Sequence, residues 1–308
     1  MTLPRQAPDG LTLAAFGLAV LLGGANFVAV RISNQELAPF WGAGLRFGLA
    51  AALFIVLAFA LRLRWPRGRQ LATTVLYGAL AFTIPYALLY WALVRATAGA
   101  ATVVLAAVPL VTLLLATAQR LERLSFRPVA GSVLALAGIA WMVLGSQALM
   151  APVGAVLAML GATLVIGQSI IIGKRLSGNH PVITNAVGMA IAAPLPLTLS
   201  ASVNETWAPP RRPDVAAALA YLVTLGSAGL FVLVLLVVRK WTASASSYMF
   251  VLFPVVTLVL AAWLVNEPMT LPAVVGAALV MAGVWFGALS STQRTSHPQR
   301  PGAQRGKS

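Results

Sequence analysis

The sequence predicts an all-α membrane protein with ten transmembrane helices, arranged as two inverted five-helix repeats with both termini in the cytoplasm. Three observations lead to this prediction: the composition, ten long apolar stretches, and a segment that recurs 145 positions later. Of the 308 residues, 60% are hydrophobic and 9% are charged, and the mean hydropathy is +0.90. Because soluble domains carry roughly 25% charged residues, this composition indicates a chain that lies mostly in lipid.

About 20 consecutive apolar residues suffice for a helix to cross a bilayer, and the sequence contains ten such stretches. Several joins between them are so short that they predict tight hairpins between antiparallel helices. We number the expected spans one to ten in chain order: Leu11–Val30, Phe40–Leu61, Leu71–Val94, Ala98–Ala118, Pro128–Leu144, Pro152–Gly173, Pro181–Ala201, Val215–Val238, Ala243–Val265 and Leu271–Leu289.

The spans divide the chain into four parts. Residues 1–10 form a cytoplasmic N-terminus, residues 11–145 the first repeat, residues 152–289 the second repeat, and residues 290–308 a basic, disordered cytoplasmic tail. The first span is too long for the apolar region of a signal peptide and lacks a cleavage pattern, so we do not expect it to be removed.

The orientation follows from the Lys and Arg residues between the spans. With a cytoplasmic N-terminus, sixteen of the 21 basic residues fall in inside segments and one, Arg46, falls within a span. Basic residues concentrate in cytoplasmic loops, so this distribution predicts that both termini are inside. The net charge of +15 is explained in the same way, and no nucleic-acid partner is expected. The four outside basic residues are Arg31, Arg95, Arg211 and Arg212.

Residues 107–138 and 252–283 are two copies of one unit. Prolines, charged residues and glycines are costly in apolar segments, so their coincidence at a constant shift is strong evidence for a duplication. Each copy contains five spans, an odd number, so the second must enter the membrane from the opposite side. Inverted repeats of this kind recur in secondary transporters. The matching pairs are Pro109 and Pro254, Thr112 and Thr257, Glu122 and Glu267, Gly131 and Gly276, and Gly138 and Gly283.

These motifs resemble the EamA-type transporters of the drug/metabolite transporter superfamily. The resemblance rests on Gly23-Gly24-Ala25-Asn26-Phe27 followed by Arg31, on Arg46, and on the paired prolines and Glu-x8-Gly units. It implies that spans one to four and six to nine line a central cavity, with spans five and ten at the periphery. It also implies a secondary transporter that works by alternating access and exports amino acids or related small metabolites across the inner membrane.

The second copy departs from the pattern. It has Gly167-Gln168-Ser169 followed by Lys174-Arg175, and it has no counterpart of Arg46. The two halves are therefore not expected to be chemically symmetric.

The distribution of ionisable residues excludes several functions. None of the six acidic residues lies near the middle of a span, which argues against a buried carboxylate proton relay and against small multidrug-resistance-type antiport. It also argues against Mg²⁺-dependent membrane transferases, and no ATP-binding loop is present. The chain has no cysteine and only two histidines, both in polar connections, so no metal site, no cofactor and no enzymatic activity are expected.

Arg46 lies about 10 Å inside the outer end of span two, from a rise of 1.5 Å per residue. An arginine within the membrane is a candidate for binding a carboxylate or a phosphate. The alternative is structural: it caps helix carbonyls or extends towards the headgroups.

Polar and aromatic residues at helical spacing predict the wall of a substrate cavity. For each set a structural alternative stays open, because membrane aromatics often serve packing or the interfacial belt and serine often bonds its own helix. The predicted cavity residues are Asn26, Arg46, Thr83, Tyr86, Tyr90, Gln168, Tyr221, Thr224, Ser227, Phe231, Ser247 and Tyr248.

Three further features have structural predictions. Pro109 and Pro254 are expected to kink spans four and nine as packing features or as hinges. Glu122 and Glu267 are expected to accept from backbone N–H groups at the start of the following helix. Glycines repeat every seven residues in spans five and ten (Gly131, Gly138 and Gly145, and Gly276 and Gly283), which permits close helix approach within the fold or in a homodimer.

The expected partners are the lipid bilayer and a small-molecule substrate, an amino acid or another metabolite. Two alternatives remain. A sugar-phosphate or nucleotide-sugar exchanger would need at least two cations facing the cavity, and the spans offer Arg46 alone. A non-transport membrane scaffold or an integral enzyme is the other alternative.

Overall fold

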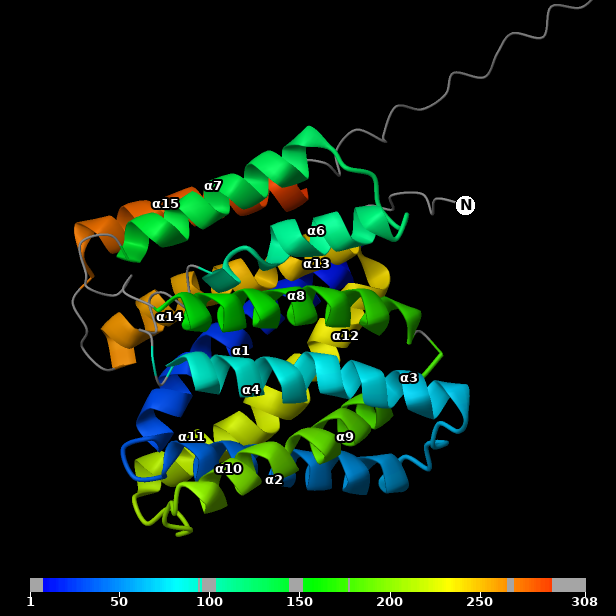
Figure 1. Ribbon diagram of the computed structural model, residues 1–308, viewed down its shortest axis with the longest axis vertical. Helices are drawn as coiled ribbons and strands as arrows, with labels where there is room; N and C mark the ends of the chain where they lie inside the picture. The colour runs from blue at the N-terminus through cyan, green and yellow to red at the C-terminus, as the bar shows by residue number, and fades with distance from the viewer. Residues whose placement is uncertain are drawn as a thin grey trace, which may run out of the picture.

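The computed structural model describes residues 8–93, 95, 104–143, 152–176, 178–264 and 269–289, and in this part of the chain all regular structure is helical (Figure 1). Spans one, two, five and six are the single helices α1, α2, α7 and α8, and span ten is α15 followed directly by the π-helix η4 (Trp285–Leu289); the others contain turns or internal π-helices. The helices are α1 (Gly10–Ser33), α2 (Pro39–Ala60), α3 (Arg69–Gly78), α4 (Ile84–Leu93), α6 (Val108–Ala118), α7 (Phe126–Val143), α8 (Val153–Arg175), α9 (Pro181–Ala192), α10 (Pro194–Ser202), α11 (Pro213–Val223), α12 (Leu230–Lys240), α13 (Ala243–Ser247), α14 (Met249–Leu264) and α15 (Leu271–Val284).

Eight helical stretches in the described residues are long and apolar enough to cross a membrane, and two further apolar helices, Val108–Ala118 and Phe126–Met142, are shorter. All ten coincide with the expected spans. The prediction of an all-α, multi-pass membrane protein is therefore confirmed. The first part of span four, as far as residue 103, lies outside the described residues.

Spans three and eight are each interrupted by a π-helix, in which backbone N–H groups donate to the carbonyl five residues back. One, η1, covers Ala79–Thr83 and joins α3 to α4; the other, η3, covers Thr224–Gly229 and joins α11 to α12. Ala79 and Thr224 are separated by the 145 positions that separate the two copies of the repeated unit. The same irregularity therefore occurs at the same place in both halves.

Span four breaks at residues 106–107, just before Pro109, whereas Pro254 lies inside a helix. Helix α6 begins at Val108, so Pro109 occupies its first turn, where a proline removes no intrahelical hydrogen bond. Pro254 lies within α14, as expected. Span nine breaks at Tyr248, between α13 and α14, and span seven breaks at Ala193, directly before Pro194.

The glycine stripes bring α7 and α15 into contact within one molecule. A Cβ atom on Gly131 would lie 2.4 Å from the Cα of Gly287, and one on Gly138 would lie 2.7 Å from the carbonyl oxygen of Gly276. Residue numbers thus rise along α7 as they fall along α15, and the two helices run antiparallel. Because the stripes are used here, they no longer indicate a homodimer. Gly145 lies outside the described residues.

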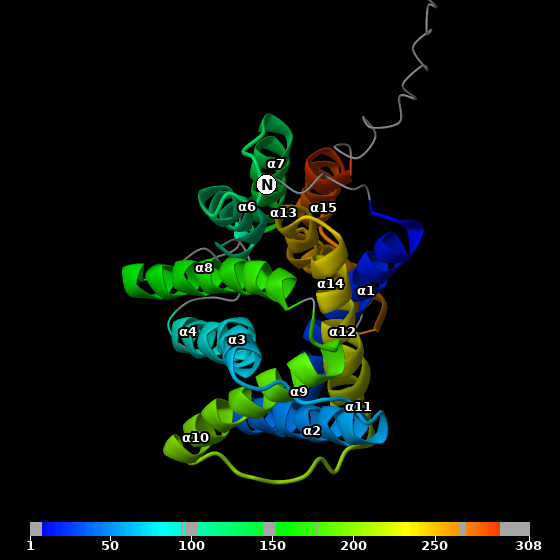
Figure 2. The same ribbon diagram turned by 90° about the vertical axis from the view of Figure 1, so that its right-hand side faces the viewer.

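The remaining helices pack in matching pairs from the two halves. Helix α1 packs on α14 and on α11 and α12, and its counterpart α8 packs on α6 and on α4. Helix α2, which is span two, packs on α9 and α10, which form span seven. Gly44 near the start of span two lies against Leu197 near the end of span seven, so spans two and seven are also antiparallel. Figure 2 shows the pair α7–α15 at one end of the molecule and α2 with α9 and α10 at the other.

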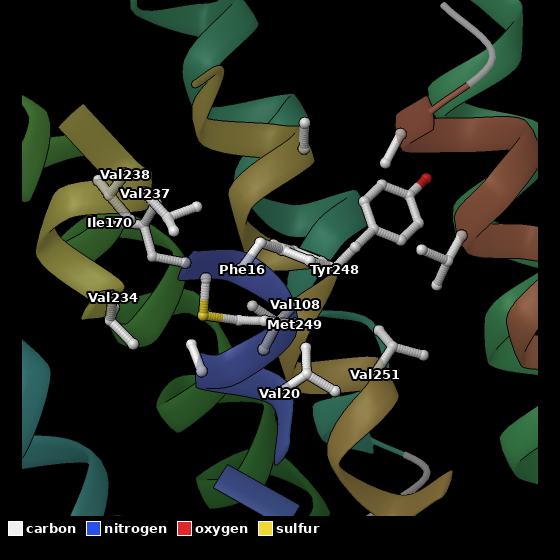
Figure 3. Close-up of a cluster of buried hydrophobic side chains, with 14 of the residues drawn as sticks. Phe16, Val20, Val108, Ile170, Val234, Val237, Val238, Tyr248, Met249 and Val251 are labelled. Carbon is white, nitrogen blue, oxygen red and sulfur yellow. The ribbon is translucent and has the colours of Figure 1, made fainter. Parts of the chain in front are cut away.

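The apolar core has two main clusters. One joins both halves beneath α7 and α15, where Phe16 of α1, Val108 of α6, Ile170 of α8 and Met249 of α14 come together (Figure 3). The other lies around α2, α3 and α9 and contains Phe47, a residue adjacent to Arg46 in the sequence.

Carboxylates from one half cap helices of the other half. Glu122 accepts from the backbone nitrogens of Ala243 at 2.6 Å and Ser244 at 3.2 Å, and from the Ser244 hydroxyl. The predicted capping chemistry is therefore present, but the capped helix is α13 and not the following helix α7. The reason is that the hairpin between α6 and α7 projects towards the start of span nine. Glu267 lies outside the described residues.

Two further interhalf caps connect the loop between α1 and α2 with the loop between α10 and α11. Glu205 accepts from the backbone nitrogens of Phe40 and Trp41, at 3.2 and 2.7 Å. Glu36 accepts from those of Arg211 and Arg212, at 2.9 and 3.1 Å. Carboxylates at helix starts satisfy free N–H groups and complement the helix dipole, so these bonds tie the halves together on this side.

Candidate substrate-binding site

Arg46 is buried between α2 and the π-helix η3, with 7% of its surface exposed. Its Nε donates to the hydroxyl of Ser227 at 2.9 Å, and its Nη2 donates to the carbonyl oxygen of Gly226 at 3.0 Å. The ion pairs found among the described residues join Arg212 to Asp214 and Lys240 to Asp9, so none of them involves Arg46. A positive charge is thus held within the membrane by neutral acceptors.

Asn26 of α1 binds the same carbonyl. Its Nδ2 donates to the Gly226 oxygen at 2.9 Å, while its Oδ1 is buried and has no hydrogen-bond partner among the described residues. Glycine is required here, because a Cβ atom on Gly226 would lie 2.0 Å from that Oδ1. One backbone oxygen therefore joins α1, α2 and span eight.

The π-helix explains why this oxygen is available. In a regular α-helix the Leu230 N–H would donate to Gly226. Here the Leu230 nitrogen donates to the carbonyls of Leu225 and Ser227 instead. Gly226 keeps both lone pairs for side chains, and Arg46 and Asn26 occupy them.

Aromatic rings surround the apolar side of the site. Phe47 lies edge-on to Tyr86 with ring centroids 5.0 Å apart, and Phe231 lies edge-on to Phe82 at 4.8 Å. A cavity of about 10 Å³ adjoins them, lined by Phe47, Phe82, Thr83, Tyr86, Ala192, Leu195, Pro196 and Leu199. This volume accommodates about one water molecule, so the predicted cavity is closed at this point.

The predicted residues of spans three and eight separate into different surroundings. Thr83 and Tyr86 line the small cavity, and the Thr83 hydroxyl has no partner among the described residues. Tyr221 donates to the carbonyl oxygen of Leu22 at 2.9 Å. Thr224 is exposed whereas Ser227 is fully buried, so the expected common face is wrong for this pair. The additional residue in the π-helical turn removes the i, i+3 alignment on which that expectation depended. The side chain of Tyr90 lies outside the described residues.

Gln168, Ser247 and Tyr248 lie apart from Arg46. Gln168 accepts from the side-chain amide of Gln119 at 2.8 Å. The Ser247 hydroxyl donates to its own helix, at Ser244. The Tyr248 hydroxyl binds the Pro128 carbonyl oxygen at 2.8 Å and the Ser132 hydroxyl at 2.9 Å, which places it in the packing against α7.

Sequence reasoning missed the importance of Gly226 and Phe47. Gly226 is one of many glycines in apolar segments, and the neighbouring residues do not predict a π-turn. Its position opposite Arg46 depends on the packing of α2 against span eight. The signal that could have found it is the pair of small residues, Ala81 and Gly226, at equivalent positions of the two copies. Among the described residues, no group of three His, Cys, Asp or Glu could hold a metal ion.

Known proteins resemble this chain along its length. The model of the EamA-like transporter family matches twice, over residues 11–144 and 153–288. A probable terminal-alkyne amino-acid exporter from Streptantibioticus cattleyicolor is 30% identical over 302 residues, which cover 94% of this chain and 97% of that protein. An uncharacterized transporter from Archaeoglobus fulgidus is 26% identical over 280 residues, which cover 87% of this chain and 95% of that protein.

A solved crystal structure has the same fold, with a TM-score of 0.75 at 19% identity, covering 91% of this chain and 98% of that one. The two family matches cover both halves of the chain, and each contains five of the expected spans. The protein belongs to the EamA-like transporter family, within the drug/metabolite transporter superfamily.

Proposed function

We propose that the protein is a secondary transporter that works by alternating access and exports amino acids or related small carboxylated metabolites across the inner membrane. The observation that carries this proposal is the buried guanidinium of Arg46, which is bound to two neutral oxygens and to no described carboxylate. A substrate carboxylate would supply the missing negative charge.

The energetics favour such a ligand. A charged group removed from water is stabilised far more by an opposite charge than by neutral acceptors, and arginine binds carboxylates through two parallel hydrogen bonds. Hydrogen bonds to charged groups contribute about 1.5–3 kcal/mol each. Arg46 is therefore suited to bind a carboxylate at a buried position between α2 and span eight.

Asn26 supports a zwitterionic substrate. Its Nδ2 and the Nη2 of Arg46 donate to the same Gly226 oxygen at 2.9 and 3.0 Å, so the Asn26 amide and the Arg46 guanidinium lie within about 6 Å of each other. The unpartnered Oδ1 of Asn26 is an acceptor that a substrate ammonium group would satisfy. The relative named a probable terminal-alkyne amino-acid exporter, 30% identical, is consistent with this substrate class.

Alternating access needs two halves that exchange conformations. The antiparallel pairing of α7 with α15, the matching contacts of α1 and α8, and the two equivalent π-helices all support an inverted repeat. The excess of basic residues in every second connection supports cytoplasmic termini.

The phosphate-exchanger alternative is less well supported. Phosphate would need a second cation beside Arg46, but the described contacts of Arg46 are with Ser227, Gly226 and the Phe47 ring. Lys174 and Arg239 instead hold carbonyl oxygens of Trp241 and Asn179. The scaffold alternative predicts no solute flux.

Counterflow in proteoliposomes tests the proposal. Vesicles loaded with unlabelled L-amino acids, including one with a terminal alkyne, should take up the labelled compound faster than protein-free vesicles. Arg46→Gln should lower uptake at subsaturating substrate by about 10- to 100-fold, as expected for one lost charge-assisted interaction. Arg67→Gln, in an exposed connection, is the matched control and should transport normally. Absence of flux for every amino acid would contradict the proposal.

A further inference from the structure

The helix segment around Gly226 has two possible registers of backbone hydrogen bonds, one π-helical and one α-helical. Leu230 donates to Leu225, five residues back, and not to Gly226, four residues back. The Gly226 oxygen that an α-helix would use is held by Arg46 at 3.0 Å and Asn26 at 2.9 Å. The π-turn persists because these side chains replace the backbone donor.

We propose that carboxylate binding to Arg46 converts this π-turn into an α-turn, with Gly226, Ser227 and Asn26 acting as positioning residues that couple binding to helix movement. This inference rests on the proposed carboxylated substrate. The segment Thr224–Gly229 together with Arg46 and Asn26 is called the span-eight switch below.

The exchange of hydrogen bonds is balanced. A carboxylate that binds the guanidinium draws Nε from Ser227 and Nη2 from Gly226. The freed lone pair of Gly226 then accepts the Leu230 N–H, while Asn26 keeps the other. At the Gly226 oxygen one donor replaces another, so the number of bonds to this oxygen does not change and a ligand that binds Arg46 can select between the two registers.

The movement is transmitted to one end of the molecule. A change of one residue in register turns α12 by about 100° and shifts it by about 1.5 Å relative to α11. Helix α12 runs for eleven residues from Leu230 to Lys240. Directly after it, the Trp241 carbonyl accepts from the Lys174 ammonium group, and the Ala243 nitrogen donates to Glu122 at 2.6 Å. The switch therefore acts on the contact between the halves that Glu122 makes.

The first half has the same π-turn without the same control. In η1, Ile84 donates to Ala79, five residues back. Span seven, the counterpart of α2 in the second half, contains no Lys or Arg that could take the place of Arg46. Substrate control is thus confined to span eight, and η1 provides the bend alone.

Distance measurements between two spin labels test the switch. The chain contains no cysteine, so Leu164→Cys and Leu236→Cys give one label on α8 and one on α12, at side chains that are 50% and 38% exposed. The probe is an equimolar mixture of L-amino acids, and the matched control is the mixture of their carboxamides. We expect the amino acids to shift the distance distribution and the carboxamides to leave it unchanged.

Arg46→Met tests the switch without any ligand. Because methionine cannot donate to Gly226, this variant should show the shifted distribution in the absence of amino acids. Ser227→Ala, which removes one hydroxyl, should shift it partly and provides the test if Arg46→Met does not fold. Thr163→Val, which removes a buried hydroxyl that donates to Met159 of α8 and to the Val104 carbonyl oxygen and has no contact with Gly226, should match the wild type.

The outcomes separate the two proposals. Unliganded variants that keep the wild-type distribution would overturn the switch. So would amino acids that exchange in counterflow without changing the distances. Shifted Arg46→Met and Ser227→Ala distributions, with no response to amino acids and no counterflow, would support the switch and refute the proposed substrate class.

Discussion

Replacement of Gly226 by alanine tests the centre of the site. A Cβ atom there would lie 2.0 Å from Oδ1 and 3.1 Å from Cγ of Asn26, and 3.3 Å from Cε1 of Tyr221. The 2.0 Å distance is far below van der Waals contact, so the Asn26 side chain must move and its bond to the Gly226 oxygen is lost. Overpacking costs about 1–3 kcal/mol, and a lost intramolecular hydrogen bond costs about 0.5–1.5 kcal/mol.

Alanine is also the better helix former, by about 1 kcal/mol. The net expectation for Gly226→Ala is a loss of about 1–3 kcal/mol in the free energy of unfolding, obtained by combining these ranges. Gly229→Ala is the matched control in the same π-helix, because its Cβ would meet nothing closer than 3.5 Å. It should be neutral or slightly stabilising.

Thermal unfolding of the detergent-purified protein, followed by the fluorescence of its eight tryptophans, measures both variants. The double variant Gly226→Ala with Asn26→Ala should recover part of the loss, because the second change removes the clashing atoms. A melting temperature of Gly226→Ala equal to that of Gly229→Ala would refute the described contact between α1 and span eight.

Three further predictions concern the framework. Gly138→Ala should destabilise the α7–α15 pair by about 1–3 kcal/mol, because its Cβ would lie 2.7 Å from the Gly276 oxygen. The control Gly48→Ala, whose Cβ would have no atom within 4 Å, should not destabilise the protein. Equal melting temperatures for the two variants would count against the pairing. Glu122→Ala should cost about 1–3 kcal/mol by leaving N–H groups of α13 without an acceptor, and an unchanged melting temperature would argue against this cap. Hydrogen bonds from Thr12 hold the pKa of the Asp9 carboxyl below 3.8. The ionised carboxylate should therefore stabilise the fold fully above pH 3.8, and this stabilisation should be lost as the pH falls further. Asp9→Asn should remove this pH dependence of stability from acid-unfolding curves.

The spans and the repeat were predictable because they depend on local composition and on spacing. Apolar stretches give the helices directly, and the glycines of α7 and α15 show the repeat because each must accommodate a close backbone approach. Arg46 was predictable for the same reason, since a charge within a span stands out in any register. These features require no knowledge of which helices meet.

The features that were missed depend on tertiary contacts. Glu122 was assigned to the wrong helix because sequence distance favours α7, whereas the folded chain brings α13 closer. Thr224 and Ser227 were placed on one face because regular α-helical spacing was assumed across a π-turn. Gln168 is predicted as a cavity residue, and its side-chain oxygen accepts from Gln119. Tyr248 looked like a cavity residue, and its hydroxyl binds α7 instead.

Topology offers an independent check on the two halves. Epitope tags in the connections 62–70 and 202–214 should report opposite sides of the membrane in intact cells and in permeabilised cells. Tags found on the same side would contradict the inverted arrangement and, with it, the exchange of conformations on which alternating access depends.

The most direct test of the central claim is counterflow of one L-amino acid and its carboxamide through the same proteoliposomes. The Arg46 site predicts that the amino acid exchanges and that the carboxamide, which lacks the negative charge, does not. It also predicts that Arg46→Lys keeps part of the amino-acid exchange, because the charge remains while the paired hydrogen bonds are lost. Equal exchange of both compounds, or full exchange by Arg46→Gln, would contradict the account.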